Sequence, residues 1–395
     1  MNRYLLKVQY LISGKSAGSI LSYTCLVLII VSAFQNADKI RYFQEPTIVQ
    51  KPHQVAPYYI NFQDSVSNDT LYQIRSQEGY PIAYYRKIKT GICFDNKCRL
   101  LDIVLYWNIT GRYLGFELPE KEFLSKTDHE PFVKKDYEQL HEILANSKSP
   151  LSGFTYNQLV LKPAADSLEL DGYTGATSPA VLDHVVEGAV YTTFMLWHLI
   201  NGSTQHKVDS LTSLMLSTEL IAEILESPDQ HDKIWALNHI KGNITLNQEL
   251  RKKIISFIQN ENFSLAERAI SSINPAELQS DSLQLLLLNR FHMTDYSLKK
   301  LIIDKIKEAP DLDEQVKIQL ANDLNELKGE MLSRVLEVFS HHNVDDKYVV
   351  SKISALMKNE NFYVSKKAYD FISNLEAKDQ DVIDMLKKYR AKHGI

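Results

Sequence analysis

Glycine, proline and cysteine are scarce in this chain of 395 residues, which has 14 Gly, 12 Pro and 3 Cys. No low-complexity tract and no long run of like charge occurs, and the net charge is −5, which argues against a general nucleic-acid-binding protein. H-E-x-x-H and C-x-x-C patterns are absent, so neither a zinc-protease helix nor a thioredoxin-like redox motif is indicated. What is present is an ordinary globular composition, 44% hydrophobic and 24% charged, with enough length for two or three domains.

The N-terminal end differs from the rest of the chain. Residues 17–37 carry no charge and are about long enough to cross a bilayer core as one helix, and Arg3, Lys7 and Lys15 precede them. The small residues of Val31–Ala33 resemble a signal-peptide cleavage site. Residues 1–37 are therefore predicted to be a signal peptide or a membrane anchor, with a buried core helix as the weaker alternative. Either preferred assignment places the remainder in the periplasm or another extracytoplasmic compartment, anchored to the inner membrane if the segment is retained.

Two of the three cysteines lie close together in the stretch CFDNKC, Cys93–Cys98. This stretch predicts a β-hairpin with Asp95-Asn96 as its two-residue turn. Cys93 and Cys98 would then form a non-hydrogen-bonded pair about 4.5 Å apart at Cα, at the short end of the range for a disulfide. A structural disulfide is favoured over a redox-active thiol pair, because no activating histidine or helix start is nearby.

Residues 38–203 predict an α+β domain, because short strand patterns and helical patterns are mixed. Segments rich in aromatic and β-branched residues predict strands at 81–88, 100–107, 112–118 and 156–162. Lys134–Ser147 predicts a helix with one apolar stripe, formed by Tyr137, Leu140, Ile143 and Leu144. A long apolar helical pattern then covers 180–200 and stops at Asn201-Gly202, with Gly188 able to break it.

Two groups of polar residues invite a catalytic or metal-binding interpretation. Asp128, His129 and Glu130 are adjacent, but no serine or cysteine nucleophile with its own motif accompanies them, so a turn or cap is favoured. His341 and His342 are also adjacent, and neighbouring side chains on a helix point about 100° apart, which makes a poor chelate. Neither group is predicted to be a site, and no metal is expected.

The second half of the chain, residues 210–395, repeats every 33 residues. Five positions of the repeat are apolar in every unit: Ala236, Ala269, Ile302, Val335 and Ala368; Leu237, Ile270, Ile303, Leu336 and Tyr369; Ile240, Ile273, Ile306, Phe339 and Ile372; Ile221, Ile254, Leu287, Leu320 and Ile353; Leu225, Ile258, Phe291, Leu324 and Met357. Each unit predicts two amphipathic helices, and stacking about five units buries a continuous core.

This repeat resembles the HEAT type of α-solenoid, with a basic residue near the start of each second helix at Arg268, Lys300, Arg334 and Lys367. The resemblance implies a module that binds or spaces a partner on its concave face. A scaffold that only packs against the first domain is the alternative.

The stretch DGYTGATSPAVLD, Asp171–Asp183, contains a helix-start signal. Pro179 suits the first helical position, and Ser178 or Thr177 suits the N-cap. The free amide groups of that helix would point toward Gly175-Ala176, whose small side chains allow a ligand to approach the backbone. These residues alone allow both a phosphate site and a simple capped helix after a glycine turn.

The pattern D-x-x-[ST]-G-A-T is matched by Asp171, Thr174, Gly175, Ala176 and Thr177, and it resembles the flavinylation motif of the FMN-binding domain family. That family includes the extracytoplasmic flavin subunits of sodium-pumping quinone reductases and related electron-transfer complexes. The resemblance implies that a flavin transferase joins FMN to Thr177 through a phosphoester, and that the other four residues serve recognition or loop geometry. Family members often have a further small or hydroxyl residue where this chain has Pro179.

Together these features predict an exported flavin carrier for electron transfer, a component of a larger system rather than a stand-alone enzyme. FMN would move one or two electrons. The helical repeats would dock a redox protein or a membrane electron-transfer complex. The alternative is a non-redox binding or scaffold protein with a degenerate flavin domain. A thiol oxidoreductase that uses Cys93 and Cys98 is a weaker third hypothesis.

Overall fold

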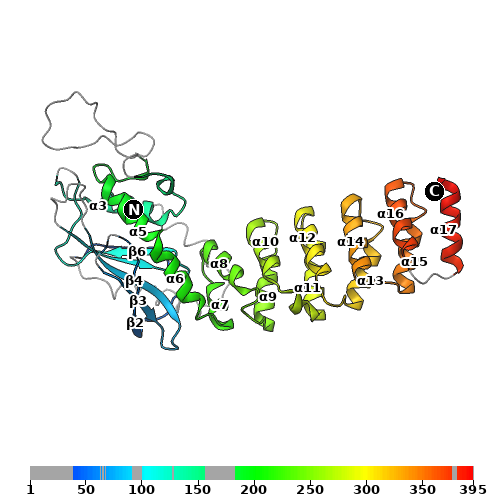
Figure 1. Cartoon of the computed structure of the whole chain (residues 1–395), viewed down its shortest axis with the longest axis horizontal. Coiled ribbons are helices and arrows are strands. Elements are labelled where there is room, and N and C mark those ends of the chain that lie inside the picture. Colours follow the sequence, from blue (N-terminus) through cyan, green and yellow to red (C-terminus); the bar gives the residue numbers. More distant parts are fainter. Residues whose placement is uncertain are drawn as a thin grey trace, which may run out of the picture.

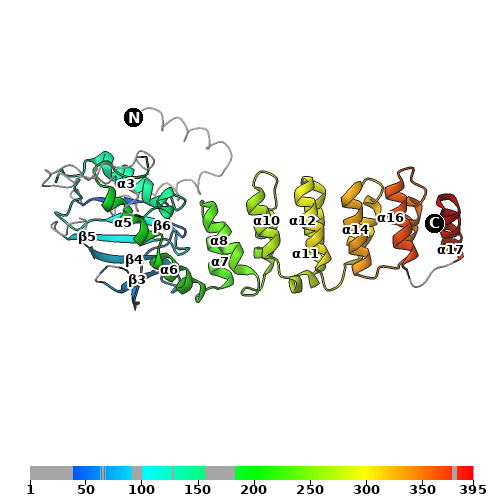
Figure 2. The same cartoon turned by 45° about the horizontal axis from the view of Figure 1, so that its top comes forward.

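The computed structural model describes residues 39–62, 64, 66, 68–90, 100–126, 129–155, 183–375 and 380–394. A β-sheet with helices on one face is followed by a long row of paired helices (Figure 1), and the turned view shows the same order (Figure 2). The predicted succession of an α+β part and an all-α part is therefore confirmed. Within the ranges described, no helix has both the length and the apolar character to cross a membrane. The predicted signal or anchor segment, residues 1–37, lies outside these ranges.

The sheet has six antiparallel strands in the order β1-β6-β5-β4-β3-β2. Its strands are β1 (Arg41–Phe43), β2 (Gln54–Tyr59), β3 (Thr70–Arg75), β4 (Pro81–Thr90), β5 (Leu101–Trp107) and β6 (Tyr113–Glu117). Strands β2 to β6 form a meander, and β1 pairs with β6 at the far edge. The strands predicted at 81–88, 100–107 and 112–118 are confirmed as β4, β5 and β6.

Alternation along the strands separates an inner face from an outer one. In β4, Tyr84, Arg86 and Ile88 are buried, whereas Lys87 and Lys89 between and beside them are exposed. The inner face packs against α3 (Lys134–Ala145), α5 (Val190–Ile200) and α6 (Ser203–Ser213), with the 3₁₀ turn η1 (Pro150–Gly153) beside α5.

Polar side chains fix α5 and α6 to the inner face. The indole N–H of Trp107 donates to the carbonyl of Ile200 at 3.0 Å. Arg86, which is fully buried, donates to Thr204 Oγ1 at 3.0 Å. The hydroxyl of Tyr84 shares a 3.1 Å hydrogen bond with that of Thr212. Since buried polar groups are costly when unpaired, these bonds specify where each helix lies.

Helix α3 confirms the prediction for 134–147, and all four residues of its predicted stripe are buried. The longer apolar pattern over 180–200 does not form one helix. Gly188 has φ +74°, a left-handed conformation, and residues 185–189 lie outside any helix, so α5 begins only at Val190. The predicted end at Asn201-Gly202 is confirmed.

The row of helices contains five pairs and one further helix in its described part. The pairs are α7 (Thr218–Ile224) with α8 (Gln230–Ile240), α9 (Gln248–Ser256) with α10 (Phe263–Ser272), α11 (Asp281–Met293) with α12 (Tyr296–Lys307), α13 (Glu314–Asp323) with α14 (Gly329–His341), and α15 (Lys347–Leu356) with α16 (Phe362–Ser373). The 3₁₀ turn η3 (Pro275–Gln279) precedes α11, and α17 (Gln380–His393) follows α16. Every residue of the five predicted apolar columns is buried. Each second helix contacts the next second helix, which makes the row a helical solenoid.

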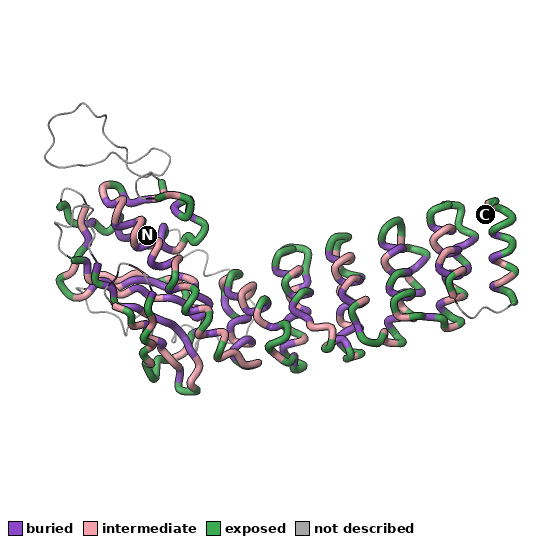
Figure 3. The backbone as a smooth tube through the Cα atoms, in the orientation of Figure 1, coloured by how far each residue is buried: buried purple, intermediate pink, exposed green. Residues whose placement is uncertain are grey.

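Repeated caps define where these helices start. The N-cap residue is Asp or Asn in α8, α9, α10, α12, α13, α15 and α16, and its side chain accepts a hydrogen bond from an amide of the first turn: Asp229, Asn247, Asn262, Asp295, Asp313, Asp346 and Asn361. Each cap contributes about 1 kcal/mol to helix stability. The buried residues form one hydrophobic cluster from the sheet to α17, and the buried stretches in Figure 3 follow this path.

Asp232 joins the sheet to the solenoid. Counting in steps of 33, it occupies the position that holds Leu265, Leu298, Met331 and Val364 in the later units, and like them it is buried. In the later units this side chain is apolar and lies in the shared hydrophobic core. In the first unit the neighbour is the sheet part of the chain, and a carboxylate takes the place of the apolar side chain.

Four residues hydrogen-bond to the Asp232 carboxylate. Thr47 and Thr110 donate from their hydroxyls at 2.8 and 2.6 Å, and Ser227 donates at 2.7 Å. Arg112 donates from Nε at 3.2 Å and from Nη2 at 2.8 Å. Burial alone would raise the pKa of Asp232, but the hydrogen bonds and charge of Arg112, with the hydroxyls, hold that pKa below its usual value. Asp232 is therefore charged and fully paired inside the joint.

Candidate functional site

The face of the sheet opposite the helices carries the outward side chains of all six strands, and we call it the open face. Its members follow from the strand register, because directly paired residues share a face. They include Arg41, Phe43, Val55, Pro57, Tyr59, Tyr72, Tyr85, Lys87, Lys89, Asp102, Val104, Tyr106, Gly115 and Glu117. All the helix contacts described above are made by the inner face, so among the described residues the open face is the part of the sheet able to meet a ligand or partner.

A row of aromatic rings crosses the open face. Tyr72 and Tyr85 are stacked with ring centroids 4.7 Å apart, and Tyr85 and Tyr106 follow at 5.6 Å. Phe43 meets Tyr106 edge to face at 5.1 Å. Gly115 lies in the same row, and a Cβ atom there would be 2.6 Å from the Phe43 ring, so the glycine leaves the space that this ring fills.

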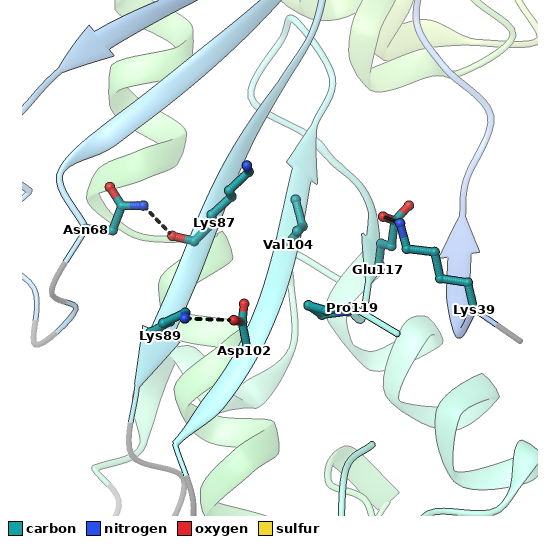
Figure 4. A pocket seen from close by; sticks show the side chains of 8 residues that line it. All are labelled: Lys39, Asn68, Lys87, Lys89, Asp102, Val104, Glu117 and Pro119. Carbon is teal, nitrogen blue, oxygen red and sulfur yellow. Dashed lines mark hydrogen bonds and ion pairs between the residues drawn. The ribbon is translucent and has the colours of Figure 1, made fainter. Parts of the chain in front are cut away.

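Beside the aromatic row, the open face has a hollow of about 510 Å³ (Figure 4). It is lined by Lys39, Asn68, Lys87, Lys89, Asp102, Val104, Glu117 and Pro119. Val104 is short and lies between the longer side chains of Lys87 and Glu117, with which it is paired across the strands. The floor of the hollow is therefore apolar and its rim is charged.

The rim contains two ion pairs. Lys39 contacts Glu117, and Lys89 contacts Asp102 at 3.1 Å. Lys87 lies over the ring of Tyr72, with its Nζ 5.8 Å from the centroid. These pairs are partly exposed, so each is worth no more than about 1 kcal/mol and remains free to exchange for another charged group.

The polar groups that line this hollow are ammonium groups, carboxylates and one amide, which are able to bind a charged group. Its eight lining residues include no serine, cysteine or histidine that could serve as a nucleophile or as a base near neutral pH. Burial raises the pKa of Tyr85, with a smaller effect from Tyr72, and burial together with the charge of Glu117 raises the pKa of Tyr106. The phenols therefore stay protonated at neutral pH, and the lysines supply the positive charge.

A second hollow of about 310 Å³ lies on the helical side of the sheet part, between α3, the start of η1 and the chain that leads into α5. It is lined by Gln139, Glu142, Ile143, Asn146, Ser149, Asp183 and His184. Gln139 donates to the carbonyl of Val185 at 3.1 Å, and the Asn146 side chain accepts from the amide of Lys148 at 3.0 Å. Two carboxylates and no lysine or arginine line this hollow, which makes it hydrogen-bonding and negative in character.

The residues predicted to bind FMN, Asp171, Thr174, Gly175, Ala176 and Thr177, lie outside the described residues. So do the predicted helix start at Pro179 and the predicted strand at 156–162. Of the stretch Asp171–Asp183, only Asp183 is described, and it lines the second hollow.

Cys93 and Cys98 also lie outside the described residues. The strands that flank them are antiparallel neighbours, with Lys89 opposite Asp102 and Thr90 opposite Leu101. This is the register that the predicted hairpin requires, because continuing the same pairing residue by residue would bring Cys93 opposite Cys98.

The Asp128-His129-Glu130 group lies at a chain reversal. Asp128 is outside the described residues, but the amide of Lys126 donates to the carbonyl of Glu130 at 2.8 Å and that of His129 donates to Lys126 at 3.0 Å. His129 has φ +61°, and both His129 and Glu130 are exposed. These features agree with the predicted turn.

Sequence reasoning missed the open face. Its tyrosines stand next to core residues of similar character, as in Tyr84-Tyr85, so composition alone does not separate them. The available signal was the alternation of Arg86, Lys87, Ile88 and Lys89, which marks the outward positions of β4.

No protein-family model, curated protein or solved structure matches this chain.

Proposed function

We propose that this protein is an extracytoplasmic electron-transfer component that carries FMN and docks a redox partner through its helical repeats. The observation that carries the proposal is the D-x-x-T-G-A-T pattern of Asp171–Thr177. Its resemblance to the flavinylation motif assigns the phosphoester to Thr177. The uncharged segment at residues 17–37 supports export, which places the motif in the compartment where flavin transferases act in that family.

The second hollow supports a place for part of the flavin. Thr177 is six residues before Asp183, so the two residues are at most about 22 Å apart along an extended chain. The amides of Gln139 and Asn146 suit the donor and acceptor atoms at the edge of a flavin ring. Its volume of about 310 Å³ is near the lower end of the range of about 300–1,000 Å³ for small-molecule sites.

The phosphate of FMN does not suit this hollow, because the carboxylates of Glu142 and Asp183 would repel it. A hollow that suits the ring but not the phosphate agrees with attachment through Thr177, because the phosphate is then part of the covalent link and only the ring needs a noncovalent binding site. When bound, FMN supplies the one- and two-electron chemistry, and the residues of the hollow orient and hydrogen-bond the ring.

The helical repeats support partner docking, and we propose that they are HEAT-like. Phe263, Tyr296, Phe362 and Tyr363 are exposed at the starts of second helices. Aromatic residues are enriched at protein–protein interfaces. Two of these rings are also oriented by neighbours: Tyr296 donates to Glu330 at 2.9 Å, and Tyr363 shares a 2.6 Å hydrogen bond with Ser333.

The experiment is to coexpress the full chain with a flavin transferase under conditions that allow export, denature it, and look for flavin fluorescence that migrates with the polypeptide. Thr177→Ala should abolish this fluorescence, because it removes the only hydroxyl to which the motif assigns FMN. The matched control is Ser178→Ala, which removes the next hydroxyl along the chain and should retain the flavin.

Three outcomes separate the candidates. Fluorescence that stays with wild type and is lost in Thr177→Ala supports the covalent carrier. Flavin released on denaturation indicates a noncovalent carrier and refutes the phosphoester. A colourless wild-type protein would favour the second candidate, a non-redox scaffold, which the paired joint at Asp232 and the five stacked units would serve without any cofactor.

A further inference from the structure

We propose that the open face of the sheet is a docking surface for an anionic phospholipid bilayer. This inference goes beyond the carriage of FMN and does not depend on it. It rests on the charge and the exposed apolar side chains of this face and on the hollow that it contains.

The sign of the charge on the open face is opposite to that of the whole chain. Lys39, Arg41, Lys87 and Lys89 stand against Asp102 and Glu117, which is four cations minus two anions, or +2. The complete chain has a net charge of −5. A local excess of positive charge on an acidic protein directs that surface toward an anionic partner and turns the rest of the molecule away from it.

The apolar side chains of the open face are most exposed at its edges. Phe43 of β1 is 42% exposed, and Val55 and Tyr59 of β2 are 46% and 85% exposed. Between them lies the row of tyrosine rings. Tyrosine, lysine and arginine are the residues that favour the membrane–water interface, because each combines an apolar body with a polar end.

The hollow adds a place for a lipid headgroup. The ammonium groups of Lys39 and Lys89 are held at its rim by Glu117 and Asp102; Lys87 and Lys89 lie on the same strand, β4, and Lys39 lies across the hollow from them (Figure 4). Exposed ion pairs are weak, so a phosphate that enters the hollow can share these lysines with the carboxylates. The headgroup would bind as an anion, above the apolar floor formed by Val104.

An acidic protein is the other occupant that the charge would suit. Two features favour the bilayer. The exposed apolar residues lie on both edge strands, β1 and β2, rather than near the centre of the face. A protein–protein interface usually has its most strongly binding residues near its centre. In addition, β1 begins four residues after Ala37, the end of the predicted anchor, which is at most about 14 Å of extended chain. A retained anchor would therefore hold the open face close to the lipid surface.

The test uses the full chain in vesicles of phosphatidylcholine, with and without phosphatidylglycerol. A water-soluble amine reagent labels the exposed lysines, and mass spectrometry gives the labelling rate at each position. The comparison works whether or not the N-terminal segment is embedded, because only the headgroup charge differs. Lys87 and Lys89 should label more slowly with phosphatidylglycerol, and added salt should remove the difference.

The decisive variant is Lys87→Gln/Lys89→Gln, with Lys39 as the reporter. Together, two lysines near an anionic membrane surface raise the affinity for that surface about 30-fold, so the double variant should lose about this factor. Lys39 should therefore lose its protection in the double variant. The matched control is Lys358→Gln/Lys388→Gln, which removes two exposed lysines of the solenoid and should leave the protection of Lys39 unchanged.

Equal labelling of Lys87 and Lys89 in the two kinds of vesicle would overturn the proposal, and so would an equal effect of the control variant. An acidic protein as the true partner would give this negative result. The outcome is independent of the flavin experiment, since a colourless protein can still show lipid-dependent protection.

Discussion

Replacing Asp232 by leucine tests whether the joint between sheet and solenoid depends on a buried charge. The change gives the first unit the apolar residue that Leu265 and Leu298 provide in later units. If the column position alone mattered, Asp232→Leu would be neutral or stabilising. The structure predicts the opposite, because in this unit the side chain meets polar groups of the sheet part.

The magnitude follows from what the substitution leaves behind. Thr47, Thr110 and Ser227 are at most 9% exposed, and all three lose their acceptor. Arg112 keeps Asp229, at 3.2 Å, but loses its better-buried partner. Single unsatisfied buried groups cost about 1–3 kcal/mol, and the hydroxyls can turn toward other acceptors. Removing one partner of a buried ion pair costs about 3–5 kcal/mol, and we expect Asp232→Leu to fall in that range.

Urea unfolding, followed by circular dichroism and by tryptophan fluorescence, measures the effect, and Trp235 lies in the same helix as Asp232. The double variant Asp232→Leu/Arg112→Leu should recover much of the loss, since it removes both charges together. As the reciprocal control, Leu265→Asp should be strongly destabilising, because it places a charge in the hydrophobic cluster of the solenoid. A neutral Asp232→Leu, or a double variant no better than the single one, would refute the assigned role of the pair.

Three further predictions concern the sheet part. His141 is hydrogen-bonded on both ring nitrogens, and burial lowers its pKa. Its neutral form therefore stabilises the fold above about pH 6.5, and this contribution is lost as the pH falls. His141→Gln should reduce the loss of thermal stability between about pH 7.5 and 5.5. Gly115→Ala would place a Cβ atom 2.4 Å from the carbonyl oxygen of Tyr42 and should cost about 1–3 kcal/mol in urea unfolding, whereas Gly153→Ala, with nothing within 4 Å, should be nearly neutral. Cys93→Ser should lower stability by a few kcal/mol at most, and a reducing agent should produce the same loss in wild type and none in the variant; an unchanged variant would argue against the disulfide.

The parts of the fold that follow a regular period could be predicted from sequence. The columns of the solenoid recur every 33 residues because each unit buries the same positions against its neighbours. Strands β4, β5 and β6 and helix α3 are also visible, since each has one clearly apolar face. Strands β1, β2 and β3 are not. β1 has three residues, β2 is an exposed edge strand that contains Pro57, and β3 buries the polar Gln73 on its inner face.

The open face and the joint could not be predicted, because both depend on contacts between distant residues. Which neighbour in Tyr84-Tyr85 faces the helices is decided by strand register, which the sequence pattern does not give. Asp232 looks like an interruption of an apolar column until Thr110 and Arg112, more than a hundred residues away in sequence, are seen beside it. The helical pattern before Asn201 is a local feature that the sequence does give: Gly188, expected as a residue able to break the pattern, is left-handed, and α5 begins only after it.

The neighbour-only contacts of the helix pairs imply a graded resistance to unfolding. The first pair is held on one side by the polar joint at Asp232, and each later pair depends on the one before it. Opening should therefore proceed along the row from pair to pair, and the pair held by the joint, α7 with α8, should open last. A protease that acts on opened helices would shorten this protein stepwise, by about one 33-residue unit at a time, and leave the sheet with its first helix pair as the most durable fragment.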